Sequence, residues 1–336
     1  MPYYLGIDGG GTQTRAVIVD EAGCVRGSGL AGPSNYHSVG VEGARAALLG
    51  AQQKAMQSAS LPQTSQFDAA CLGLAGCGSE EDRLQLQSIV SALNVRGASS
   101  VLIESDLRIA HAGAFEGEAG MVLIAGTGSS CLGVNAQGKV ARSGGWGPMF
   151  DDRGSGFDIG RMAIIHTLRA ADGRDVPSSL AEQVMEKLGG DLRAIARMTA
   201  TGQDRTRIAS LAPLVFAAAA LREPCASAII HVAAEELARM VFAVAKQLEM
   251  DNKPIEVVVL GGLNSAGRLF FQSLYDAVRR QLPLASIVSD MMPAVLGAAL
   301  MAMKHAGITA TDEMLSAMKR TYEAMKIQLS PSNPIA

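Results

Sequence analysis

A glycine-rich turn occurs twice in this chain, 115 positions apart, and it limits the folds that the chain can form. Near the start the sequence reads GIDGGGTQTRAVIVD, and further on it reads LIAGTGSSCLGVN. At this offset Gly11-Thr12 overlays Gly126-Thr127, and the alternation of apolar residues stays in phase as far as Val25 and Val140. Because each turn joins two segments with strand alternation, the pattern predicts two β-hairpins of one design and a duplicated domain.

The rest of the chain fits two α/β domains. With 336 residues, of which 48% are apolar, it is long enough for two cores. Strands are predicted at 3–8, 15–20, 25–30, 67–75, 101–104, 121–125, 130–135 and 256–260. Helices are predicted at 40–60, 80–93, 106–115, 267–281 and 311–328, and 156–247 is largely helical. We therefore predict an N-terminal domain at 1–115 and a C-terminal domain at 116–336 with a helical insertion. The final helix is a candidate to pack back on the first domain.

Charge and cysteine usage exclude several classes of protein. The net charge is −3 and the basic residues are scattered, so no nucleic-acid partner is expected. The uncharged, apolar stretch at 208–221 is too short to span a bilayer and contains Pro213, so no membrane association is expected. The five cysteines show no CxxC spacing, and no basic region precedes an apolar one at the start. We therefore expect a cytoplasmic protein with reduced thiols.

The glycine turns are suited to phosphate. Consecutive glycines let backbone N–H groups point into one cavity with no Cβ in the way, and a threonine hydroxyl adds a donor. Two such turns can hold successive phosphates of one nucleotide. Asp8, at the end of the strand before the first turn, is placed to hold a hydrated Mg²⁺. The alternative for each turn is a tight hairpin that needs glycine for a positive φ.

Other nucleotide motifs are missing or lack their context. No G-x-x-x-x-G-K-[ST] occurs, and the only Gly-Lys pair is followed by Val140. A G-x-G-x-x-G match spans 27–32, but Pro33 follows it and no helix begins there. We interpret that match as a loop.

Six segments in their order carry a family resemblance: GIDGGGTQTRAVIVD, GLAGCGSEED, ESDLRIAHAGA, LIAGTGSSCLG, SGGWGPMFDDRGSGFDIG and VVLGGLNS. The chain resembles the N-acetylglucosamine kinase group of the BadF/BadG/BcrA/BcrD ATPase-type family, within the sugar kinase, actin and heat-shock chaperone superfamily. The resemblance extends from residue 4 to about residue 300. It implies an α/β fold of two ribonuclease-H-like (actin-like ATPase) domains around a central cleft. It also implies ATP and Mg²⁺ as cofactors, a small-molecule sugar as substrate, and a homodimer.

The resemblance also assigns roles to residues. Asp106, which follows the strand VLIES and begins a helix, matches the catalytic base, although by chemistry alone it is equally an N-cap. The residues matching nucleotide-binding positions are Gly10, Gly11, Thr12, Gly126, Thr127, Gly128, Ser129, Gly261 and Gly262. Those expected to contact sugar are Asn35, Tyr36, Asp106, Gly145, Trp146, Gly147 and Asp152. A lone Trp is more often a core residue, and the five histidines are interpreted as ordinary surface or core residues.

The sequence departs from the family at the sugar side. The family's Gly-Asp-Glu-Gly-Ser stretch reads Asp-Asp-Arg-Gly-Ser here, with Asp151 and Arg153 as the changes, and Ser130 stands where some relatives have Asn. Arg153 can only donate hydrogen bonds where a Glu would accept them, so we expect it to change the choice of sugar. The alternative is that Asp151 and Asp152 beside it neutralise it by pairing. The predicted reaction is phosphoryl transfer from ATP to the 6-hydroxyl of an amino sugar, with N-acetylglucosamine, glucosamine or another sugar left open. The alternatives are an ATPase activator of an iron–sulfur enzyme and a non-catalytic sugar sensor.

Overall fold

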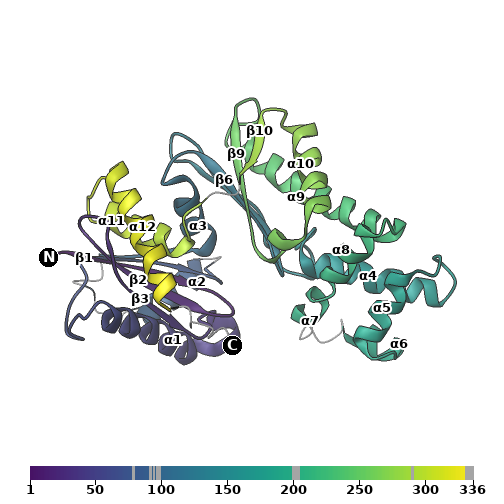
Figure 1. Cartoon of the computed structure of the whole chain (residues 1–336), viewed down its shortest axis with the longest axis horizontal. Helices are drawn as coiled ribbons and strands as arrows, with labels where there is room; N and C mark the ends of the chain where they lie inside the picture. The colour runs from purple at the N-terminus through teal and green to yellow at the C-terminus, as the bar shows by residue number, and fades with distance from the viewer. Residues whose placement is uncertain are drawn as a thin grey trace, which may run out of the picture. The chain divides into compact units, whose positions relative to one another are not determined.

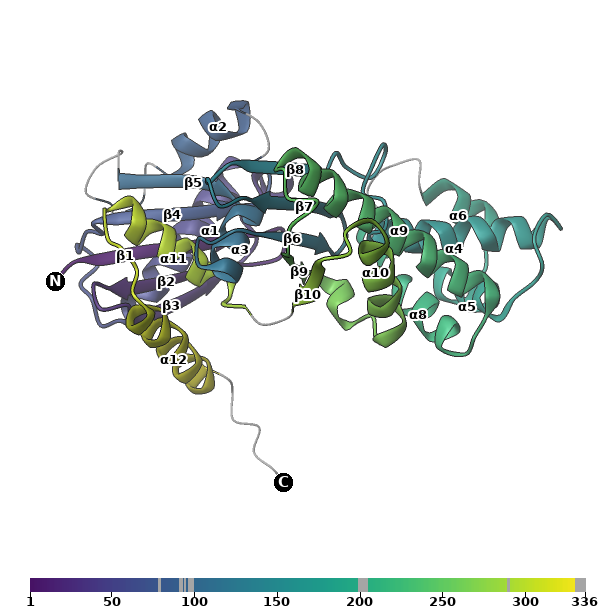
Figure 2. The same ribbon diagram turned by 90° about the horizontal axis from the view of Figure 1, so that it is seen from above.

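The computed structural model of the chain describes residues 1–77, 80–90, 93, 95, 100–198, 205–288 and 291–329. The chain forms two compact units, each shown in Figures 1 and 2. The first unit comprises Met1–Glu118 and Asp290–Ala336, and the second comprises Ala119–Ser289. The first unit is therefore built from both ends of the chain.

The first unit contains a five-stranded mixed sheet in the order β3-β2-β1-β4-β5. Its strands are β1 (Tyr3–Gly9), β2 (Thr14–Asp20), β3 (Val25–Ala31), β4 (Ala69–Leu74) and β5 (Val101–Ser105). The β1–β2 and β2–β3 pairs are antiparallel, whereas β1–β4 and β4–β5 are parallel. The carboxyl ends of β1, β4 and β5 therefore share one edge of the sheet.

The second unit repeats this topology. Its sheet has the order β10-β9-β6-β7-β8, with antiparallel β6–β7 and β7–β8 pairs and parallel β6–β9 and β9–β10 pairs. Its strands are β6 (Gly120–Ala125), β7 (Ser129–Val134), β8 (Val140–Gly144), β9 (Ile255–Leu260) and β10 (Ala285–Val288). The prediction of two hairpins of one design is confirmed, although the first turn spans 10–13 and the second spans only 126–128.

In the described part of the first unit, five helices accompany the sheet. They are α1 (Tyr36–Ser58), α2 (Glu80–Val90), α3 (Asp106–Phe115), α11 (Ala294–His305) and α12 (Asp312–Leu329). The final helix α12 packs on β3, where Thr321 Oγ1 accepts a hydrogen bond from Val25 N at 2.9 Å. The sequence analysis placed 116–336 in the second domain except for that helix, but α11 also belongs to the first unit. Figure 1 shows α11 and α12, in yellow, beside the strands of this sheet.

Close backbone contact explains the position of α11. A Cβ at Gly6 of β1 would lie 2.6 Å from the Val295 carbonyl oxygen, so the helix rests directly on the strand. Gly297 meets Gly113 of α3 in the same way. The helix α11 was not predicted from the sequence because most of its residues are buried, which leaves only a weak amphipathic pattern.

The helical insertion lies in the second unit. Its helices are α4 (Gly156–Ala171), α5 (Ser179–Leu188), α6 (Leu192–Met198), α7 (Arg205–Ala209), α8 (Ala212–Ala220) and α9 (Pro224–Gln247). The short 3₁₀ helix η2 (Gly262–Ser265) and α10 (Arg268–Gln281) follow β9. Across the described residues, we find no helix that is both long and apolar enough to cross a membrane.

Candidate active site

Two carboxylates meet at the carboxyl edge of the first sheet. The strand register places Asp8, Gly73 and Glu104 in one row across β1, β4 and β5, and Asp106 follows β5 directly. Burial and the negative charge of Asp106 together raise the pKa of Asp8 to about 6, although the positive charge of Arg15 opposes both effects. The pair therefore forms a concentrated negative site at the strand ends, as the sequence predicted for each residue separately.

Asp106 begins α3 but is not its cap. Ser105 holds the N-cap position, and its hydroxyl accepts a hydrogen bond from Arg108 N at 3.2 Å. The Asp106 carboxylate accepts a local hydrogen bond from Leu107 N at 2.9 Å. The N-cap alternative for Asp106 is therefore wrong, because a neighbouring serine performs that role.

The first glycine turn has an open surface. Gly10 N donates to Gln13 O at 3.0 Å and closes the turn, and Thr12 is exposed. Gly10 and Gly11 are absent from the described glycines with positive φ. A Cβ at Gly11 would meet nothing within 4 Å. Neither backbone conformation nor packing requires glycine there, which leaves the space that a bound anion would need.

The second turn lies against β9. Gly126 N donates to Gly128 O at 2.9 Å, and Thr127 is exposed. Gly261, with φ of 103°, passes so close that a Cβ there would lie 2.6 Å from the Ala125 carbonyl oxygen. The parallel pairing of β6 with β9 thus brings the predicted Gly126 and Gly261 together at one sheet edge.

A pocket of about 440 Å³ opens beside this turn, within the second unit. Its lining combines Gly126, Thr127 and Gly262 with residues that the sequence did not single out: Gly156, Thr206, Ala209, Ser210, Ala212, Pro213, Phe216, Leu263 and Ala266. Its volume and largely apolar walls are typical of small-molecule sites. No local motif marks these residues, because α7 and α8 reach the turn only through tertiary packing.

Asp152 is held inside the second unit. It is buried with a left-handed φ of 55°, and its carboxylate accepts from Ser129 N at 3.1 Å and from Arg205 Nη2 at 2.6 Å. Burial raises its pKa, and these two partners lower it. Ser129 also donates its hydroxyl to the Arg153 carbonyl at 2.7 Å, so both of its donors are used within the protein.

The alternative in which Arg153 pairs with Asp151 and Asp152 is wrong. Its guanidinium bonds Asp158 of α4 at 3.1 Å rather than Asp151 or Asp152. Asp151 instead accepts from Trp146 N at 3.1 Å, and Asp152 is satisfied by Ser129 and Arg205. Arg153 therefore belongs to the amino terminus of α4, where the Asp158 carboxylate forms ion pairs with basic side chains.

The loop at 144–150 displays apolar side chains. Gly144, Gly145 and Gly147 all have positive φ, and Trp146 is 83% exposed. The alternative of a core tryptophan is therefore wrong. A Cβ at Gly145 would collide with the Arg142 guanidinium, so a cation also lies at this loop.

The predicted sugar loop of the first unit contains an unforeseen histidine. Asn35 caps α1 by accepting from His37 N at 3.1 Å, and the Tyr36 hydroxyl donates to Asp82. His37 Nε2 lies 3.2 Å from the same Asp82 carboxylate. Gly76, after β4, sits so close that a Cβ would lie 3.0 Å from His37 Cδ2. His37 therefore belongs with this loop and is not an isolated surface residue.

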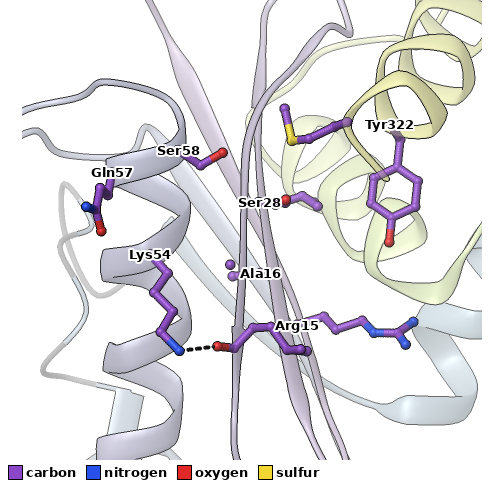
Figure 3. A pocket seen from close by; sticks show the side chains of 11 residues that line it. Arg15, Ala16, Ser28, Lys54, Gln57, Ser58 and Tyr322 are labelled. Atoms are coloured by element: carbon purple, nitrogen blue, oxygen red, sulfur yellow. Dashed lines mark hydrogen bonds between the residues drawn. The ribbon is translucent and has the colours of Figure 1, made fainter. Parts of the chain in front are cut away.

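A separate groove lies on the outer edge of the first sheet (Figure 3). It has a volume of about 710 Å³ and is walled by α1, β2, β3 and α12. Lys54 donates a hydrogen bond to the carbonyl oxygen of Leu30 at 2.7 Å, and the dashed line at Lys54 in Figure 3 marks this bond. None of the predicted site residues lines this groove, so it is distinct from the candidate site.

Comparison with known proteins places the chain in a family. Residues 5–302 match the model of the BadF/BadG/BcrA/BcrD ATPase family. The chain belongs to this family. Family membership agrees with the two duplicated five-stranded sheets and supports an ATP-binding protein.

Similar proteins of this family are sugar kinases. The N-acetylmuramic acid/N-acetylglucosamine kinase of Clostridium acetobutylicum is 33% identical over 310 residues, 90% of this chain and 98% of that protein. The N-acetyl-D-glucosamine kinase of Dictyostelium discoideum is 32% identical over 89% of this chain and 97% of its own length. A putative N-acetylglucosamine kinase from Chromobacterium violaceum superposes with a TM-score of 0.74 at 28% identity, covering 90% of this chain and 99% of its own.

Proposed function

We propose that the chain is an ATP-dependent kinase that phosphorylates the 6-hydroxyl of an amino sugar, N-acetylglucosamine or glucosamine. The observation that carries the proposal is Asp106, a carboxylate at the end of β5 whose capping role is taken by Ser105. In phosphoryl transfer such a carboxylate accepts the proton of the attacking hydroxyl. The full-length similarity to sugar kinases supports the same reaction.

The residues divide between nucleotide and sugar. We assign the phosphates to Gly10, Gly11, Thr12 and the turn at 126–128, and the nucleoside to the 440 Å³ pocket with Gly261 and Gly262. Asn35, Tyr36 and the loop at 145–147, with Asp152 behind it, are assigned to the sugar. His37 is added because it shares Asp82 with Tyr36.

Asp8 would hold the Mg²⁺. Its half-buried carboxylate, with a pKa raised to about 6 by burial and by the charge of Asp106, fits a divalent cation because a positive charge would relieve both effects. Bound there through water, the metal would neutralise phosphate charge during transfer. The protein's own contribution is to place the Asp8 and Asp106 carboxylates separately, at the ends of β1 and β5.

The rival functions have less support. An activator that shares an iron–sulfur cluster between subunits needs accessible cysteines, yet Cys71, Cys77 and Cys131 are buried and Cys24 and Cys225 are half-buried. A non-catalytic sensor has no need of the Asp8–Asp106 pair. We also propose that the protein is cytoplasmic and that it forms a homodimer. Light scattering on the purified protein tests the homodimer.

The test is a coupled assay of ADP release with a panel of sugars. N-acetylglucosamine, glucosamine, N-acetylmuramic acid and glucose are compared at equal concentration, with and without EDTA. We expect Mg²⁺-dependent turnover that is highest with one of the two proposed amino sugars. No turnover with any of the four sugars would contradict the kinase assignment, and faster turnover with glucose would contradict the amino-sugar assignment.

A further inference from the structure

Arg205, the first residue of α7, has donors that its known partner does not use. Its Nη2 donates to the buried Asp152 carboxylate at 2.6 Å. Its Nε is buried, and no hydrogen-bond partner for it is found among the described residues. A guanidinium offers five N–H donors in one plane, whereas this contact uses one of them. The group is therefore anchored to Asp152 and still able to bind another anion.

The guanidinium lies on the second glycine turn. A Cβ at Gly128 would overlap Arg205 Nη2 and would approach Asp152 Oδ1 to 2.8 Å. Gly128 does not appear among the described glycines with positive φ, so the backbone conformation does not demand glycine. The Arg205 guanidinium therefore occupies the space that a side chain at position 128 would take, which places the cation against the turn.

The residue after Arg205 in α7 lines the pocket that we assign to the nucleoside. Thr206 lines the 440 Å³ pocket together with Gly126 and Thr127 of the turn. Arg205 thus stands where the pocket meets the turn. Its side chain remains about 39% exposed, so a ligand has access to it.

We propose that Arg205 binds the phosphates of the nucleotide, with Asp152 orienting its guanidinium; this inference rests on the proposed kinase function. A planar guanidinium donates two parallel hydrogen bonds to phosphate oxygens, a geometry that an ammonium cannot reproduce. Asp152 contacts the nucleotide only through Arg205. The competing explanation is that Arg205 serves solely to neutralise the buried Asp152.

Calorimetric titration of the full chain with AMP, ADP and a non-hydrolysable ATP analogue, without sugar, separates the two explanations. We expect Arg205→Ala to weaken ADP and analogue binding by about tenfold to a hundredfold, the range for charge-assisted hydrogen bonds, with a smaller loss for AMP. Arg205→Lys should restore part of the affinity. Arg207→Ala, on the exposed side of the same short helix, is the matched control and should bind like wild type.

The Asp152→Asn background decides whether phosphate contact is direct. If Arg205 binds phosphate, Arg205→Ala still weakens ADP binding in that background. If ADP affinity changes by less than about twofold in either background, the proposal is overturned while the kinase assignment stands. If wild type itself binds neither ADP nor the analogue, the proposed function fails first. Thermal unfolding of each variant verifies that the loss is not one of folding.

Discussion

The role of Asp106 can be tested separately from helix capping, because the residue before it caps α3. Because Ser105 caps α3, Asp106→Asn should leave the helix start intact and remove the proton acceptor. We expect kcat to fall by at least about a hundredfold while the affinities for ATP analogue and sugar change little. Ser105→Ala is the control: it should cost about 1 kcal/mol of stability and only a few-fold in kcat. A variant Asp106→Asn with nearly normal kcat would rule out this base.

Asp8 gives the apoprotein a pH-dependent stability. Its pKa in the folded chain is about 6, above the ordinary aspartate value, because burial and Asp106 oppose ionisation. The folded state therefore binds the proton more tightly than the unfolded state. This stabilisation is fully present below about pH 4 and is lost as the pH rises through about 6.

Asp8→Asn removes the cost of burying the charge. In EDTA near pH 8 we expect the free energy of unfolding of the variant to exceed that of wild type by about 1–2 kcal/mol. The difference should shrink toward pH 4. Urea unfolding across this range measures it. A difference that does not vary with pH would show that Asp8 is not charged and buried as the structure has it.

Among the elements, those with a periodic pattern were predictable and those without one were not. The hairpins of both halves were found because strand alternation and glycine turns are local signals. The buried helix α11 was missed because burial on several sides removes the pattern. The edge strands β8 and β10 were missed because they are only five and four residues long, too short for a clear alternation. The interpretation of the G-x-G-x-x-G match at 27–32 as a loop is wrong, because its residues as far as Ala31 lie in β3. Its glycines have a packing reason, since Cβ atoms at Gly27 and Gly29 would overlap the backbone of α1.

The candidate site follows the same division. Asp8, Asp106 and the glycine turns lie at strand ends, which the alternation locates along the chain. The pairing of Arg205 with Asp152 and the proximity of His37 to Gly76 arise from tertiary packing, so no spacing in the sequence indicates them.

The crossing of α3 and α11 depends on glycine. A Cβ at Gly297 would overlap the Ile109 carbonyl oxygen and the Gly113 nitrogen, and backbone cannot move aside as a side chain can. We expect Gly297→Ala to destabilise the protein by about 2 kcal/mol or more. Gly50→Ala is the matched control in α1, where the nearest atom to a new Cβ is 3.8 Å away, and it should stabilise by roughly 0.5 kcal/mol. Equal effects of the two substitutions would contradict the close crossing.

At the scale of the whole molecule, the two units differ in how the chain builds them. The core of the second unit is drawn entirely from one continuous segment, from Met121 to Ala285. The first unit has a core on each face of its sheet, and the one under α11 and α12 joins Tyr4, Val17 and Cys71 to residues beyond position 290. The first unit therefore needs both ends of the chain, whereas the second has all of its core within one stretch.

This difference predicts how fragments behave. A fragment comprising Ala119–Ser289 should fold cooperatively, because it retains its whole sheet and core. On the proposed function it should also bind ADP, since the 440 Å³ pocket and Arg205 lie within it. It should show no kinase activity, since Asp106 lies outside it.

A fragment comprising Met1–Glu118 alone should fail to fold, because one face of its sheet loses α11 and α12 and exposes apolar side chains to water. Circular dichroism and urea unfolding of the two fragments measure this contrast, and calorimetry measures the ADP binding. Cooperative unfolding of the Met1–Glu118 fragment would show that α11 and α12 are dispensable to the first core.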